Sequence, residues 1–302
     1  MDNPAVLDLL PTEQVRPGLE DLDTRPVEDV VGELLAAERA VAAVLDAARA
    51  DLAVAAAAVA ERLGTGGRLV YVGAGTPGRI AALDAVECGP TFGVPDGTVV
   101  AVVAGGEQAA GRAVEEAEDD VAAARADLSG LQLSPRDVVV GITASGRTPF
   151  VVEALAVARS AGAVTIAVTN NADSPVARAV DHRIELLTGP EVVGGSTRLT
   201  AGTAQKIALN VLSTAAMIRG GRTYGAWMVG VQATNDKLRR RAARIVQEIT
   251  GVSATQAADA LAAASGDTAV ALVMLVRGVE PAVARARLHA TGGHVRNALA
   301  DG

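Results

Sequence analysis

The sequence predicts an α/β protein with a doubly wound parallel sheet of five strands, preceded by N-terminal helices and followed by a small C-terminal helical domain. Two patterns predict this class. Five short apolar segments rich in β-branched residues alternate with longer helix-like stretches, which is typical of a parallel sheet covered on both faces. Glycine- and serine-rich turns follow several of these segments. Sheets of this kind bind ligands there, at the carboxyl ends of their strands.

The N-terminal part is expected to be helical. Residues 27–63 are rich in alanine, valine and leucine with interspersed charges, and they contain neither glycine nor proline after Gly32. This composition favours two helices or one long broken helix. Three glycines between positions 64 and 67 end the run, and the apolar segment 68–73 predicts the first buried strand.

The same strand pattern recurs four times along the chain. We expect further strands over residues 98–103, 137–142, 163–168 and 182–187. We expect helices between the strands over residues 78–87, 108–128, 149–161 and 174–179.

Beyond the sheet the chain is expected to be helical to its end. Helices are predicted over 196–219 and 235–250, and short helices separated by glycines follow Gly251. A basic run inside 235–250 is more typical of a solvated helix face than of an anion site. The domains are therefore expected to span 1–52 (helical arm), 53–235 (α/β domain) and 236–302 (C-terminal helical domain).

Composition excludes several classes of protein. The 302 residues are 50% hydrophobic but only 2% aromatic, and 35 acidic against 27 basic side chains give a formal charge of −8. Such a chain lacks the basic surface and stacking rings of a nucleic-acid binder. Its longest apolar stretch, 52–60, is far shorter than the ~20 residues of a membrane span. We therefore expect no nucleic-acid partner and no membrane insertion.

Cysteine and the first residues indicate the compartment. Cys88 is the only cysteine, so no internal disulfide forms, and no cysteine or histidine cluster suggests a metal site. Residues 1–14 carry acids and a proline where an export signal has basic residues and an apolar run. These features predict a cytoplasmic protein.

The first candidate loop follows the first strand. Gly73-Ala-Gly75-Thr76-Pro-Gly78-Arg79 matches G-x-G-x-x-G and opens a helix, which is typical of a phosphate cradle. A dinucleotide site also needs an acidic residue after the next strand, where the chain has Ala104-Gly-Gly106. A phosphorylated small molecule therefore fits better than a dinucleotide, and a tight turn without a ligand stays open as an alternative.

Two further segments carry hydroxyl and basic side chains. The second loop, after the strand at 137–142, offers Ser145, Gly146, Arg147 and Thr148 before a proline that starts a helix. Capping of that helix by the hydroxyl of Ser145 or Thr148 is an alternative reason for these residue types, and a cap is compatible with a bound ligand. The third segment, 189–206, offers Ser196, Thr197 and Lys206. Its serine and threonine are first of all candidate helix caps, and Lys206 is equally typical of an ordinary surface.

Taken in order, blocks 68–93, 143–150, 189–206 and 209–235 resemble the bacterial N-acetylmuramic acid 6-phosphate etherases, sugar-isomerase-type (SIS) proteins of peptidoglycan recycling. The similarity continues into the C-terminal helices and covers most of the chain after about residue 25. The resemblance implies a flavodoxin-like SIS fold, a homodimer, and an amino-sugar phosphate as ligand. Because the glucokinase regulatory proteins resemble the same family, the fold alone does not decide activity.

The resemblance also implies a chemistry without metal or redox cofactor. The lactyl ether at C3 of N-acetylmuramic acid 6-phosphate is eliminated and water is added, giving D-lactate and N-acetylglucosamine 6-phosphate. The family's acid corresponds to Glu87, near the end of the predicted helix 78–87, and its second glutamate, the base, to Glu118. Taken alone, Glu87 is typical of a surface glutamate, and Glu118 belongs to an acidic run.

The chain departs from the family pattern at three positions. Pro77 stands where the family has a hydroxyl residue, Arg16 where it has asparagine, and Thr200 where it has lysine. Pro77 removes both a side-chain ligand and a backbone donor. These departures leave the accepted sugar phosphate open.

Two other functions are compatible with this sequence. One is a phosphosugar sensor without catalysis: the substitutions at Pro77 and Thr200 leave it open, although the presence of both Glu87 and Glu118 favours the enzyme. The other is an aldose–ketose isomerase, a chemistry that often uses histidine. His182, His289 and His294 all lie outside the glycine-rich loops, so we rank the isomerase last.

Overall fold

The computed structural model describes residues 9–112, 114–231 and 235–300. The chain divides into two compact units, one of Met1–Ala85 with Val99–Ser213 and the other of Val86–Thr98 with Thr214–Gly302. The predicted domain boundaries after residues 52 and 235 stay predictions.

A five-stranded parallel sheet forms the centre of the first unit. Its strands are β1 (Leu69–Gly73), β2 (Val99–Val103), β3 (Val138–Thr143), β4 (Val164–Thr169) and β5 (His182–Glu185). They lie in the order β2-β1-β3-β4-β5, and every neighbouring pair is parallel. The fold class and all five strands are thereby confirmed.

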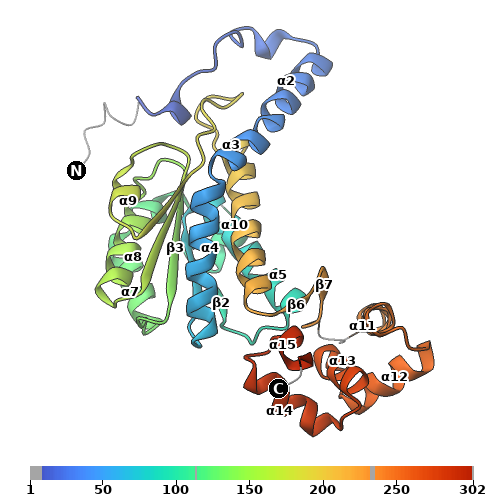
Figure 1. Cartoon of the computed structure of the whole chain (residues 1–302). Helices are drawn as coiled ribbons and strands as arrows, with labels where there is room; N and C mark the ends of the chain where they lie inside the picture. The colour runs from blue at the N-terminus through green and yellow to red at the C-terminus, as the bar shows by residue number, and fades with distance from the viewer. Residues whose placement is uncertain (1–8, 113, 232–234, 301–302) are drawn as a thin grey trace. The chain divides into compact units, whose positions relative to one another are not determined.

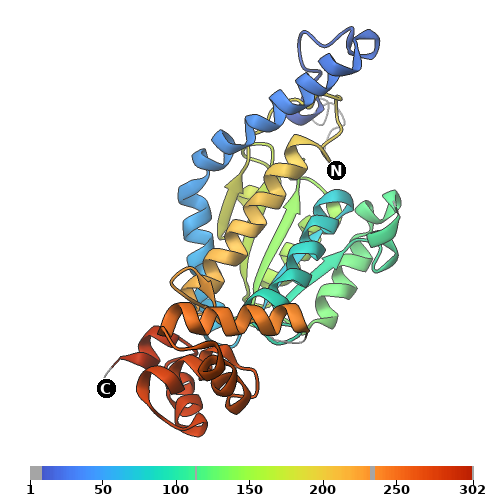
Figure 2. The same ribbon diagram turned by 90° about the vertical axis from the view of Figure 1, so that its right-hand side faces the viewer.

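Helices cover both faces of this sheet, so it is doubly wound (Figure 1). On one face α7 (Val121–Gly130) and α8 (Pro149–Ser160) share a core with Val70 and Val72 of β1. The other face is covered by α4 (Arg49–Gly64), α5 (Gly75–Phe92) and α10 (Thr200–Arg219) (Figure 2). The hydroxyl of Tyr71, which follows Val70 on β1, donates a hydrogen bond to Asp84 of α5. Alternate residues of one strand thus enter two separate cores, which explains why the strands are apolar throughout.

Several helix boundaries differ from the expected ones. Residues 27–64 form three helices, α2 (Val27–Arg39), α3 (Val41–Ala47) and α4, rather than one or two. The helix expected over 108–128 is divided into α6 (Gln108–Gly111), the 3₁₀ helix η3 (Glu115–Asp119) and α7. It restarts at α7 because the Asp120 side chain caps that helix, accepting a hydrogen bond from the Ala123 amide at 2.8 Å.

The helix that begins at the first loop is longer than expected. It was expected to end at residue 87, before Gly89 and Pro90, but α5 continues to Phe92. Phe92 is buried with 6% of its surface exposed, so packing overrides the local stop signal. Glu87 therefore lies in the interior of α5 rather than at its end.

The second unit has its own helical core. After a small antiparallel pair, β6 (Thr223–Tyr224) and β7 (Trp227–Met228), it contains α11 (Asp236–Thr250), α12 (Ala254–Ala263), α13 (Thr268–Arg277), α14 (Pro281–Ala290) and α15 (Val295–Leu299). The basic side chains of α11 are exposed, while Ala242, Ile245 and Val246 are buried. The solvated face expected for this run is confirmed.

In the described part of the chain, no single helix is both long and apolar enough to cross a membrane. The helices α12 and α13 pass that test only as a pair, and they are bent by 114° at the break between them.

A buried ion pair fastens the start of β1 to the start of β3. The carboxylate of Asp137 accepts hydrogen bonds from the Arg68 guanidinium at 2.9 and 3.0 Å and from the backbone amides of Arg68 and Ser134 at 2.9 and 2.8 Å. Burial acts to raise the pKa of Asp137, but these donors outweigh it and lower the pKa to about 2.

Asp137→Asn is expected to destabilise the protein by about 2 kcal/mol at pH 7, because a pKa lowered from 3.8 to about 2 stabilises the ionised folded state. The stabilisation is present above the unfolded pKa and is lost as the pH falls from about 4 to 2. Urea unfolding at pH 7 and pH 2.5 measures this, with exposed Asp127→Asn as the control. An equal deficit at both pH values would contradict the assignment.

Candidate active site

The first two candidate loops meet where the strand order reverses. From β1 the chain crosses to β2 on one side, and from β3 it crosses to β4 on the other. The connections after β1 and β3 therefore diverge, and sheets of this kind bind ligands in the crevice that such a switch point forms at the carboxyl ends of its strands. The β1 loop carries Gly75, Thr76, Gly78 and Arg79.

Glycines bring α5 close against the end of β1. A Cβ on Gly78 would lie 2.6 Å from the Gly73 carbonyl oxygen and 2.8 Å from Val103 Cγ1. A Cβ on Gly73 would lie 2.7 Å from the Gly78 nitrogen. Only glycine allows this approach. It sets the first turn of an 18-residue helix, with exposed Gly75, at the edge of the crevice.

Pro77 lies in this first turn and lacks an N–H. Pro77→Ser is expected to lower the Kd for N-acetylglucosamine 6-phosphate by about 5- to 150-fold, because it adds a backbone donor and a hydroxyl, each worth about 0.5–1.5 kcal/mol and together about 1–3 kcal/mol. Calorimetric titration measures the change. Pro90→Ser, at an exposed position of the same helix, serves as the control. An unchanged Kd in Pro77→Ser would remove position 77 from the phosphate contacts.

Hydroxyl groups follow one another along the second loop. Thr143 Oγ1 lies 3.3 Å from Ser145 Oγ and 2.8 Å from Thr148 Oγ1. The Gly146 amide donates to Thr143 at 3.2 Å, and the Arg147 amide donates to Ser145 at 3.1 Å. Gly146 has φ +68°, and a Cβ there would lie 2.2 Å from Ser174 Oγ, so this turn requires glycine.

The structure brings Glu118 to this loop. The Thr148 hydroxyl donates a hydrogen bond of 2.7 Å to Glu118 Oε1, although the two residues are 30 positions apart. Glu118 lies on η3, in the connection after β2. This contact gives Glu118 a direct bond to the second loop. The catalytic role of Glu118 stays a prediction.

Glu87 is exposed on α5, and its catalytic role also stays a prediction. One turn before it, Asp84 is buried and accepts hydrogen bonds from the Tyr71 hydroxyl at 2.8 Å, the Asn210 amide at 2.7 Å and the Ser213 hydroxyl at 3.2 Å. These bonds join α5 to β1 and α10.

The third segment is arranged differently from the expectation. Ser196 and Thr197 do not cap a helix, because α10 begins only at Thr200. Its first amides, of Thr200 and Ala201, instead donate to the fully buried carboxylate of Glu191 at 3.0 and 2.8 Å. That carboxylate already satisfies the helix N-terminus.

The third segment nevertheless lies beside the first loop. A Cβ on Gly202, in the first turn of α10, would lie 3.3 Å from Thr76 Cγ2. Ser196 and Thr197 are half-buried in the loop that leads into α10, and Lys206 is exposed on its second turn. Their binding roles stay predictions.

Several buried polar residues near the candidate loops were not predicted from the sequence. Asn170 and Asn171 follow β4, where their position at a strand's carboxyl end was an available signal. The amide of Gln205 donates to Asn170 Oδ1 at 2.8 Å, and the amide of Asn171 donates to Thr12 Oγ1 at 2.9 Å and to the Ala144 carbonyl at 2.9 Å. Thr12 is fully buried, so the N-terminal segment lies against the loops after β3 and β4.

Arg16, one of the departures from the family pattern, also fixes this segment. Its guanidinium donates to the Pro190 carbonyl at 3.0 and 3.2 Å. In this structure, Arg16 therefore contacts the loop that leads into α10 of its own chain.

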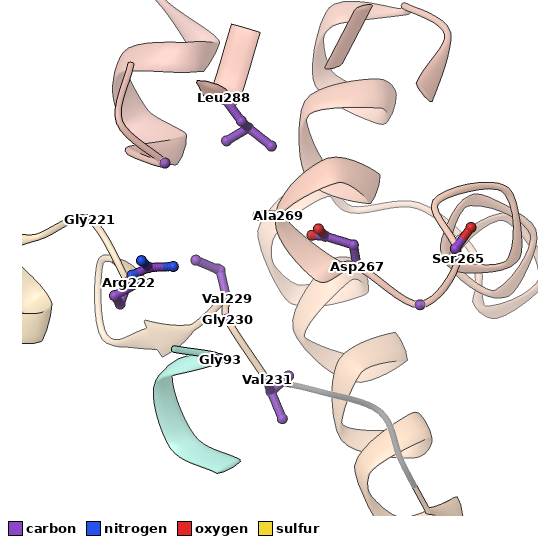
Figure 3. A pocket seen from close by; sticks show the side chains of 12 residues that line it. Gly93, Gly221, Arg222, Val229, Gly230, Val231, Ser265, Asp267, Ala269 and Leu288 are labelled. Carbon is purple, nitrogen blue, oxygen red and sulfur yellow. The ribbon is translucent and has the colours of Figure 1, made fainter. Parts of the chain in front are cut away.

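A separate cavity of about 540 Å³ lies within the second unit (Figure 3). Arg222 and Asp267 are the charged side chains that line it, together with apolar residues and five glycines. None of the predicted site residues is among its lining residues. In the described ranges, no group of three or more histidine, cysteine, aspartate or glutamate side chains is placed to hold a metal ion.

Comparison with known proteins identifies the class and then the family. The chain matches the models of the glucokinase regulatory protein N-terminal SIS domain over residues 51–159 and of the SIS domain over residues 119–215. A solved structure assigned as a phosphosugar isomerase involved in capsule formation, from Bacteroides fragilis, aligns with a TM-score of 0.49 and 26% identity over 64% of this chain and 91% of that chain. The sheet, its loops and the two SIS domain matches define an SIS protein.

Curated relatives give the family. The chain is 46% identical over 296 residues to N-acetylmuramic acid 6-phosphate etherase of Streptomyces avermitilis, covering 98% of this chain and 95% of the relative. It is 48% identical over 293 residues to the protein of that name from Rubrobacter xylanophilus, covering 97% of each. The chain belongs to the N-acetylmuramic acid 6-phosphate etherase family.

Proposed function

We propose that this protein is a lyase that cleaves the C3 lactyl ether of N-acetylmuramic acid 6-phosphate by elimination and hydration. Family membership over nearly the whole chain supports the reaction. The observation that carries the site is the 2.7 Å bond from Thr148 to Glu118, which joins the proposed base to a loop suited to hold phosphate.

The proposed chemistry needs two carboxyl groups in different protonation states. In the open-chain aldehyde the carbonyl acidifies the C2 proton, and Glu118 removes it. Glu87 protonates the ether oxygen as its bond to C3 breaks and D-lactate leaves. Water then adds to C3 of the unsaturated aldehyde and a proton returns to C2, giving N-acetylglucosamine 6-phosphate. The net change is the addition of one water across the ether.

The phosphate is proposed to lie in the crevice between the first two loops. The first-turn amides of α5 and the hydroxyls of Ser145 and Thr148 are the proposed donors. With a formal charge of −8, the chain does not attract anions as a whole. Affinity must therefore come from these local donors.

Release of D-lactate from N-acetylmuramic acid 6-phosphate by the purified protein tests the proposal. Elimination and hydration also predict deuterium at C2 of the product in D₂O and ¹⁸O at C3 in H₂¹⁸O. Lactate that appears without the C2 label would contradict the elimination. Tight binding of the sugar phosphate with no lactate would indicate the alternative, a sensor without catalysis.

Assembly as a homodimer and a cytoplasmic location complete the proposal. Val27, Val31 and Leu35 recur every four residues on α2 and are 78%, 47% and 55% exposed. They form an apolar stripe of the kind that protein interfaces cover. Light scattering after gel filtration measures the assembly. The chain has one cysteine, Cys88, and so cannot form an internal disulfide, which supports a reducing compartment.

A further inference from the structure

We propose that Arg79 is a positioning residue that holds the segment carrying Glu118, rather than a ligand of the substrate's phosphate. Arg79 follows the G-x-G-x-x-G loop directly, where sequence reasoning assigns it to phosphate. The inference concerns how the acidic segment is held, and it rests on the proposed function of Glu118 as the base.

The guanidinium of Arg79 is directed at backbone of the β2–α7 connection. Its Nε donates to the Ala109 carbonyl at 2.9 Å and its Nη2 donates to the Arg112 carbonyl at 2.9 Å. These carbonyls lie at the end of α6, where a helix leaves its last carbonyls without internal partners. One planar fork therefore fixes the end of α6, and Glu118 follows six residues after Arg112.

The same connection is fastened at its other end by the Thr148 bond to Glu118. Gly105, at the start of the connection, lies close against this segment. A Cβ on Gly105 would lie 3.2–3.3 Å from the Cβ atoms of Ala109, Val114 and Ala117. A shift at Arg79 would therefore move η3 and the Glu118 carboxylate with it.

Phosphate binding through the Nε and Nη2 edge of Arg79 requires the fork to leave these carbonyls. A bidentate arginine–phosphate pair uses two parallel N–H groups, and here Nε and Nη2 are both engaged. Lysine keeps the charge but has no planar fork to bridge two carbonyls. The substitutions Arg79→Lys and Arg79→Gln therefore separate the two roles.

If Arg79 is a positioning residue, the substitutions to lysine and to glutamine are expected to have equal effects on kcat, Kd and amide exchange. The kcat for D-lactate release should fall about 10- to 100-fold, since a misplacement near 1 Å costs up to about 10²-fold. The calorimetric Kd for N-acetylglucosamine 6-phosphate should stay within about twofold of the wild type. Amide hydrogen exchange across residues 104–120 should accelerate.

Arg287→Gln provides a matched control, because Arg287 likewise donates to two carbonyls, of Ala298 and Ala300, but in the helical unit. It should change neither kcat nor exchange across 104–120. A Kd that weakens more than tenfold in Arg79→Gln and recovers in Arg79→Lys would overturn the proposal, as would unchanged exchange across 104–120 in both variants. If the wild type releases no lactate, the proposed function fails, while the exchange and Kd measurements still decide the role of Arg79.

Discussion

Glu87→Gln is expected to lower kcat for D-lactate release by about 10²- to 10⁴-fold, the usual contribution of a general acid. Glutamine keeps the shape of the side chain but has no proton to give to the departing ether oxygen. Because Glu87 is exposed on α5, the folded structure should not change, and the circular dichroism and urea midpoint should match the wild type.

The leaving group distinguishes an acid from a residue that only binds. A C3 aryl ether leaves without protonation, so it should restore most of the turnover of Glu87→Gln. Asp96→Asn, at an exposed position just after α5, should leave kcat unchanged. An equal deficit on alkyl and aryl ethers would remove Glu87 from the acid role.

Glu118→Gln is expected to lower kcat by a similar factor, about 10²- to 10⁴-fold, through loss of the base that removes the C2 proton. The amide oxygen of glutamine can still accept the Thr148 hydroxyl bond, so the loop geometry should be kept. The specific readout is isotope exchange. The wild type should exchange the C2 hydrogen with D₂O, and Glu118→Gln should not.

A neighbouring glutamate gives the control for this experiment. Glu116 lies two residues away on the same 3₁₀ helix and is exposed. Glu116→Gln should therefore retain both lactate release and C2 exchange. Persistent C2 exchange in Glu118→Gln would assign the base to another group. An aryl leaving group should not rescue this variant.

The strands were predictable because buried parallel strands have a strong local signal. This signal is a short run rich in β-branched residues, apolar at the positions that face either side of the sheet. Helix ends depend on packing and were less predictable. Nothing local to Gly89 and Pro90 shows that Phe92 will be buried and carry α5 onward. The break at Asp120, in contrast, was readable, because an aspartate three residues before the amide that it caps is a recognised start signal.

The candidate loops were likewise visible as glycine and hydroxyl patterns at strand ends. Their partners were not. Sequence singles out Glu118 only through the resemblance, since Glu116 and Asp119 have the same local character. The bond to Thr148 arises from sheet topology that brings residues 30 positions apart together. The burial of Glu191 at the start of α10 depends in the same way on tertiary structure.

The hydrogen bonds between the hydroxyls of the second loop all run in one direction, from donor to acceptor. Each hydroxyl has one proton, and Thr148 gives its proton to Glu118, so Thr143 must donate to Thr148 and Ser145 to Thr143. The longest step, 3.3 Å, is the one from Ser145. A phosphate oxygen that takes the Ser145 proton therefore breaks only the weakest link, and the shorter bonds that orient Glu118 remain in place. Under the proposed function, phosphate binding by Ser145 and orientation of the proposed base Glu118 can thus occur together along one row of three hydroxyl side chains.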